Sequence, residues 1–159
     1  MGSRGQSVIE IVLYLGLVIL IMPVIAALTF FSADVRVRGQ EVNVVTAEGE
    51  RLAQVLSQTI RNAKGINSPL LGESNSQLSL KIADSAKDPT IFSLNNGAIT
   101  IKEGAGQAVS LTSSQMTASN LTFSNRSQAG TPGTIKIQFT LSAANLTKTF
   151  YVSASLRQK

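Results

Sequence analysis

The chain contains no cysteine, no histidine and no tryptophan, and only 5% of its 159 residues are aromatic. Without cysteine and histidine it cannot form disulfides or use a thiol nucleophile, and zinc and haem sites lose their usual ligands. General acid–base catalysis by histidine is excluded as well. Only nine carboxylate side chains remain, and they are scattered along the chain. We therefore expect a protein that is not an enzyme and that binds no cofactor and no metal.

Charged residues are scarce and unevenly distributed. They make up 14% of the chain, against roughly 25% in soluble domains. Residues 1–103 contain nine basic and nine acidic side chains, so the net charge of +5 comes from residues 104–159 alone. A mildly cationic, solvated surface explains this excess; attraction to an anionic partner such as DNA is the alternative. The candidate contacts for such a partner are Arg126, Lys136 and Lys148.

An uncharged apolar run, IVLYLGLVILIMPVIAALTFF, extends from Ile11 to Phe31. As a helix it would span about 30 Å, the thickness of the hydrocarbon core of a bilayer. It is longer than the apolar region of a secretory signal peptide. The run predicts a transmembrane helix over residues 6–33. Pro23 lacks an N–H group, so together with Gly16 it predicts a bend in this helix.

The next segment, residues 34–64, changes from uniformly apolar to amphipathic. Its apolar residues recur at steps of three and four, as on one face of a helix. Gly39 and Gly49 each weaken that helix by up to about 1 kcal/mol, and Gly65 is placed where a C-cap glycine is expected. We predict one nearly continuous helix over residues 7–64. The apolar stripe of its second half consists of Val42, Val45, Leu52, Val55, Leu56, Ile60 and Ala63.

Residues 65–159 have the texture of a β structure. INSPLLGESNS, residues 66–76, has the composition of a loop. Six or seven short runs with alternating apolar residues follow it, and Asn95-Asn96-Gly97 between two of them predicts a tight hairpin. An antiparallel sheet needs a cover for its apolar face, and the stripe of residues 34–64 can supply one. The predicted fold is therefore α+β: a long N-terminal helix, transmembrane in its first half, packed through its second half on a C-terminal antiparallel sheet.

A charged motif directly precedes the apolar run: Arg4-Gly5-Gln6-Ser7-Val8-Ile9-Glu10. A carboxylate carried to the middle of a bilayer costs on the order of 2.5–3.5 kcal/mol, so Glu10 is a functional candidate by default. Glycine, a variable residue, serine, two aliphatic residues, glutamate and about twenty apolar residues follow one another in this order. This pattern resembles the class III signal of type IV pilins and pseudopilins.

The resemblance implies a processing pathway and a location. Residues 1–5 would be a leader that a prepilin peptidase removes by cutting the Gly5–Gln6 bond, and the same enzyme would N-methylate Gln6. The chain would be a single-pass protein of the inner membrane, with a cytoplasmic N-terminus and residues 34–64 and 65–159 forming one extracytoplasmic domain. Its partners would be other pilin or pseudopilin subunits and the inner-membrane assembly platform. Because Gln6 replaces the phenylalanine usual in major pilins, the resemblance points to a minor pilin or pseudopilin.

The same resemblance assigns a role to Glu10 in assembly. After cleavage the new amine at Gln6 would be cationic and would lie near Glu10 of a neighbouring subunit. Each unpaired charge in a dry helical core costs several kcal/mol. Pairing the two charges would therefore offset that cost and set the axial register between subunits of a type IV pilus, a type II secretion pseudopilus or a competence pseudopilus.

Two other interpretations remain open from the sequence. The first is a DNA-binding pilin of an uptake machine, in which the basic residues after position 103 contact phosphates. The second is an uncleaved single-pass membrane protein of another class, such as a sensor or a scaffold. In both of them the apolar run over residues 11–31 stays a membrane helix.

Overall fold

The computed structural model describes residues 3–128, 130, 132–144 and 146–157, with side chains for these residues outside 3–7 and 31–41. The chain divides into two compact units, Met1–Gln40 and Glu41–Lys159. We call them the N-terminal unit and the C-terminal unit. The boundary lies inside the predicted segment 34–64, and residues 41–64 belong with the strands of residues 65–159.

One helix, α1 (Ser3–Asn62), accounts for the predicted transmembrane and amphipathic segments. Its helical conformation continues through Pro23 and Gly49. The helix ends when Ala63 N–H donates to the carbonyl of Ile60 (3.1 Å) and the chain turns into strand pairing. The prediction that Gly65 caps the helix was wrong. Gly65 does not have a positive φ angle, because the chain passes from the helix into a strand without a left-handed residue, and Gly65 is the first residue of that strand.

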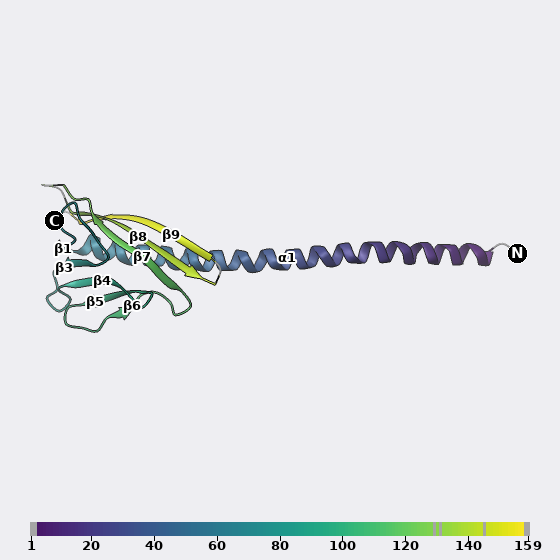
Figure 1. Cartoon of the computed structure of the whole chain (residues 1–159), viewed down its shortest axis with the longest axis horizontal. Coiled ribbons are helices and arrows are strands. Elements are labelled where there is room, and N and C mark those ends of the chain that lie inside the picture. The colour runs from purple at the N-terminus through teal and green to yellow at the C-terminus, as the bar shows by residue number, and fades with distance from the viewer. Residues whose placement is uncertain (1–2, 129, 131, 145, 158–159) are drawn as a thin grey trace. The chain divides into compact units, whose positions relative to one another are not determined.

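The strands of the C-terminal unit form two antiparallel sheets, where we predicted one sheet (Figure 1). Their orders are β1-β3-β4-β5-β6 and β2-β7-β8-β9. Alternation of apolar residues shows which side of a strand is buried but not which strand lies beside it, so the division was not visible in the sequence. The strands are β1 (Gly65–Ser68), β2 (Ser74–Asn75), β3 (Leu78–Lys81), β4 (Thr90–Asn95), β5 (Ala98–Glu103), β6 (Val109–Ser110), β7 (Thr117–Asn125), β8 (Thr134–Ala143) and β9 (Leu146–Ser155).

Local signals gave the strands correctly wherever a turn or an apolar alternation was strong. Asn96 and Gly97 both have positive φ (49° and 75°), as a two-residue type I′ turn requires, and Asn95 pairs with Ala98 across it. The prediction of a loop over residues 66–76 was wrong in part. This stretch contributes β2 and most of β1, two short strands whose polar residues do not alternate with apolar ones.

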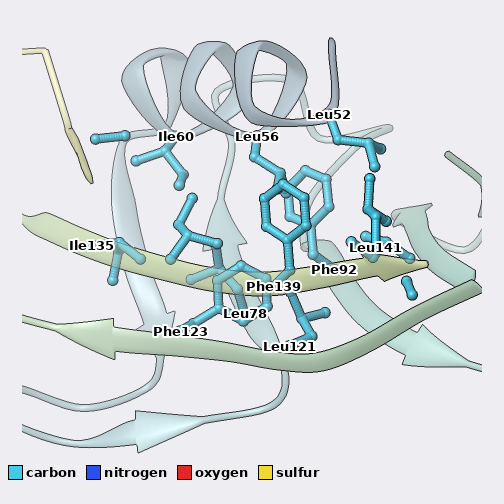
Figure 2. Close-up of a cluster of buried hydrophobic side chains, with 14 of the residues drawn as sticks. Leu52, Leu56, Ile60, Leu78, Phe92, Leu121, Phe123, Ile135, Phe139 and Leu141 are labelled. Atoms are coloured by element: carbon cyan, nitrogen blue, oxygen red, sulfur yellow. The ribbon is translucent and has the colours of Figure 1, made fainter. Parts of the chain in front are cut away.

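Both sheets of the C-terminal unit contribute to a single apolar core, which the last turns of α1 cover (Figure 2). Leu52, Leu56 and Ile60 have no exposed surface, and the four-residue spacing places them on one face of the helix. They point toward side chains from both sheets, among them Phe92 of β4 and Phe139 of β8. The predicted helical cover is therefore confirmed for residues 45–63.

The predicted stripe is buried at five of its seven positions. Val45 and Ala63 lie in the core with the three residues above. Val42 is 43% exposed, and Val55 is only half-buried. The buried face of α1 in the C-terminal unit therefore begins at Val45.

Candidate functional site

The predicted processing site lies in the first turns of α1. The backbone of Gly5 and Gln6 is helical, and the side chain of Gln6 lies outside the described residues. Of the predicted leader, residues 1 and 2 lie outside the described residues too. Cleavage at Gly5–Gln6 and methylation of Gln6 thus stay predictions.

Glu10 lies on the exposed surface of α1. Its carboxylate accepts one hydrogen bond, from the hydroxyl of Tyr14 at 3.4 Å. Tyr14 follows Glu10 by four residues, which is the spacing at which side chains of a helix meet. No side chain that the structure describes forms an ion pair with Glu10. The carboxylate therefore keeps an oxygen available to a cation from outside this part of the chain.

Tyr14 is the residue of this site that sequence reasoning did not connect with Glu10. The signal that could have found it is the spacing of four between a hydroxyl donor and a carboxylate inside an apolar helix. A carboxylate near a membrane needs hydrogen-bond donors, and within residues 8–30 the hydroxyl of Tyr14 is the donor that reaches it. Tyr14 belongs with Glu10 in the candidate site.

Glu10 lies near the start of an apolar segment of α1 that has no buried residue. Val8–Phe30 comprises 23 residues, none of them buried, and its most apolar stretch of 18 residues has a mean hydropathy of 2.9. At 1.5 Å per residue it measures about 34 Å, enough to cross the hydrocarbon core of a bilayer. Large apolar side chains lie open along it, for example Leu20 at 72% and Phe30 at 78%. Length and composition thus make this part of α1 a candidate membrane span.

Thr29, a polar residue near the end of the candidate span, is hydrogen-bonded inside the helix. The hydroxyl of Thr29 donates to the carbonyls of Ala26 (2.7 Å) and Ile25 (3.2 Å). A Cβ atom added at Gly16 would meet no atom of another described residue within 4 Å. Pro23 removes one helical hydrogen bond, although the helical conformation continues through it. The bend predicted at Gly16 and Pro23 stays a prediction.

The three cations proposed as contacts for an anionic partner do not share one surface. Lys136 on β8 pairs with Ser124 and Ser153, whereas Lys148 on β9 pairs with the buried Leu141. Because side chains alternate across a sheet, Lys136 and Lys148 point to opposite faces. Lys148 donates to the hydroxyl of Thr46 (3.0 Å) and lies over the ring of Phe150.

Arg126 lies on the same face as Lys136. Its N–H donates to the carbonyl of Thr134, two residues before Lys136 on β8, and residues two apart on a strand share a face. The structure thus brings Arg126 and Lys136 together and separates Lys148 from them. In the described part of the chain, no three acidic side chains gather where they could hold a metal ion.

Comparison of the chain with protein-family models, with curated proteins and with solved structures finds no match.

Proposed function

We propose that this protein is a structural subunit, a minor pilin or pseudopilin, which is held in the membrane by α1 until it enters a filament. The observation that carries the proposal is the position of Glu10. A carboxylate with one intrahelical hydrogen bond stands near the start of a 23-residue apolar helical segment that has no buried residue. Five and four residues before it, Gly5 and Gln6 form the dipeptide at which a prepilin peptidase would cut.

Cleavage would create the partner that Glu10 lacks. Hydrolysis of the Gly5–Gln6 bond leaves a free amine at Gln6, which is cationic at neutral pH. A filament core built from apolar helices contains little water, so an unpaired Glu10 carboxylate there costs several kcal/mol. The amine of a neighbouring subunit offsets that cost only at one axial position. The hydrogen bond from Tyr14 would orient the carboxylate for this contact.

The rest of α1 suits passage from a bilayer to a filament. Gly16 carries no side chain, and Pro23 frees a backbone carbonyl one turn earlier. The helix can bend at these positions as neighbouring subunits replace lipid. The C-terminal unit, with its own core under Leu52, Leu56 and Ile60, would form the exposed surface of the subunit, as the helix-covered sheet of a pilin does.

The proposal is tested in cells that supply a prepilin peptidase and an assembly machine. The Gly5→Ala variant should keep its leader and stay in the membrane. The Glu10→Gln variant should be cleaved normally, but its recovery in sheared filaments should fall about tenfold or more, because the charge pair is lost. Glu50→Gln, which removes another exposed carboxylate of α1, is the matched control and should enter filaments normally. Normal incorporation of Glu10→Gln into filaments would show that Glu10 does not set the axial register between subunits.

A DNA-binding subunit of an uptake machine is the second candidate function. Arg126 and Lys136 lie on one face of the sheet that contains β7 and β8, and residues 104–159 contain no acidic side chain. Binding of this kind has a clear signature, an affinity that falls steeply as salt is raised. It would depend on Arg126 and Lys136 and not on Lys148, which points to the opposite face.

A further inference from the structure

A pocket of about 750 Å³ opens in the C-terminal unit where α1 ends. Five stretches of the chain form its wall: the last turn of α1 with the start of β1, the turn that begins at Pro69, the end of β7, the approach to β8 and the residues just after β9. No pattern in the sequence predicted this pocket. None of the residues involved belongs to the Glu10 site or to the face with Arg126 and Lys136.

Three cationic side chains line this pocket: Arg61, Lys64 and Arg157. No acidic residue is among the lining residues, and none of the three has a side-chain hydrogen bond or ion pair to a described residue. Elsewhere in the unit Arg51 is paired with Glu48, and Lys87 with Glu103. The carboxyl end of a helix carries only about half a negative charge. Three full positive charges exceed it, so the pocket attracts anions.

Two exposed leucines belong to the apolar part of the same pocket. Leu70 is 65% and Leu71 is 59% exposed, and both line the opening. A fixed turn presents them: Leu70 N–H donates to the carboxylate of Glu73 (3.3 Å), and Gly72 N–H donates to the carbonyl of Asn125 (3.0 Å). Exposed apolar patches rimmed by polar residues mark surfaces that contact other molecules, and these two leucines line a pocket with three cationic side chains.

The walls of the pocket are tied to one another. The amide of Asn125, which is only 5% exposed, donates to the carbonyl of Pro69 (2.8 Å) and accepts from Ser127 N–H (3.1 Å). At the other side Arg157 N–H donates to the carbonyl of Arg61 (3.1 Å). These bonds fix the backbone that carries the cations and the leucine turn before any ligand arrives, which reduces the entropy lost on binding.

We propose that this pocket binds an acidic peptide segment of a partner protein, one that carries aliphatic side chains between its carboxylates. Guanidinium groups bind carboxylates through paired hydrogen bonds, which Arg61 and Arg157 can supply. Aliphatic side chains of the segment would cover Leu70 and Leu71. A nucleic acid fits less well, because no aromatic side chain lines the pocket to stack on a base. This inference does not rest on the proposed function.

The test uses the full chain in detergent micelles and a fluorescein-labelled, acetylated peptide of sequence Asp-Leu-Glu-Leu-Asp. Fluorescence anisotropy should show saturable binding with a Kd below about 1 mM. Lys64→Glu and Arg157→Glu should each weaken it about tenfold. Lys102→Glu, an exposed charge on β5 outside the pocket, is the matched control with the same change in net charge and should bind as the parent does.

The apolar half of the pocket is tested separately. Leu71→Ser should weaken binding about tenfold, and Val109→Ser, at an equally exposed position of β6, should have no effect. An Asp-Ser-Glu-Ser-Asp peptide should bind as weakly to the parent as the leucine peptide binds to Leu71→Ser. Absence of saturable binding, equal losses in Lys64→Glu and Lys102→Glu, or tighter binding of a single-stranded DNA oligonucleotide that depends on Lys64 would each overturn the proposal.

Discussion

At the scale of single residues, Gly49 shows how one position serves the packing of the C-terminal unit. A Cβ atom built on Gly49 would overlap the ring of Phe150. That ring stacks on Phe139 with centroids 5.2 Å apart. Glycine, which the sequence presents as a weak point of the helix, is thus the residue that allows α1 and β9 to approach each other.

The Gly49→Ala variant should therefore be less stable than the parent. Overpacking costs typically 1–3 kcal/mol, which exceeds the gain of at most about 1 kcal/mol from the higher helix propensity of alanine. Thermal unfolding of the detergent-solubilised chain, followed by near-ultraviolet circular dichroism, measures the loss. Adding Phe150→Leu should restore part of it, since the smaller side chain leaves room for the methyl group. An unchanged midpoint for Gly49→Ala would show that the ring does not occupy this position.

In the C-terminal unit, the carboxylate of Glu48 forms contacts whose contribution to stability depends on pH. Its carboxylate accepts from Nε and Nη2 of Arg51 (both 3.0 Å) and from Ser113 N–H (3.2 Å). The hydrogen bonds from Arg51 are the largest cause that lowers the pKa of Glu48 below its ordinary value of 4.5, against a smaller rise from burial. The side chain of Arg51 also donates to the carbonyl of Leu111, so the pair ties α1 to the loop after β6.

A lowered carboxyl pKa stabilises the folded state fully above the unfolded value, and this contribution disappears as the pH falls through the folded value. The parent should accordingly lose stability as the pH drops below 4.5. Glu48→Gln should start less stable at neutral pH and change less over the same acid range. Unfolding midpoints across that range measure both, with Glu50→Gln as the control that keeps the parental slope. The same change of unfolding midpoint with pH in Glu48→Gln and in the parent would contradict this role of the Glu48 carboxylate.

At the scale of elements, a charge introduced into the apolar part of α1 distinguishes a membrane anchor from an ordinary exposed helix. A charge placed at its centre should disturb a membrane anchor by about 2.5–3.5 kcal/mol. Ile19→Arg should therefore be extracted from membranes by alkaline carbonate to a much greater extent than the parent. Val44→Arg, at an exposed position of α1 in the C-terminal unit, should remain as the parent does. Equal retention of both variants would argue against a membrane span at residues 8–30.

Elements with a strong local signal could be predicted from the sequence. The four-residue spacing of Leu52, Leu56 and Ile60 gave the buried helix face, and Asn96-Gly97 gave a hairpin that needs positive φ at both residues. Pairings between distant segments could not be predicted. Ser74 of β2 pairs with Ser124 of β7, fifty residues along the chain, and neither residue belongs to an apolar alternation.

The candidate sites also differ in whether they could be predicted from the sequence. Glu10 and its neighbours form a contiguous motif, so the sequence alone identifies them, and Tyr14 follows from helical spacing. The pocket lined by Arg61, Lys64 and Arg157 depends on chain segments that meet only after folding. Lys148 appeared equivalent to Lys136 in the sequence, but the strand register places it on the opposite face.

At the scale of the whole molecule, the two units differ in what they need from their surroundings. The C-terminal unit buries a core of its own, from Val45 to Ala154. The N-terminal unit leaves the side chains of residues 8–30 exposed, which makes it a candidate for surroundings of lipid or of other helices. The filament subunit that we propose, which begins in a membrane, would meet both conditions in turn.

The mass of the mature N-terminus tests this account most directly. The chain is purified from cells that contain a prepilin peptidase and from matched cells that lack it, and the N-terminal peptide is measured by mass spectrometry. We predict a chain that begins at Gln6 and carries one methyl group in the first cells, and a chain that still includes residues 1–5 in the second. A chain that retains Gly5 in both would contradict the account.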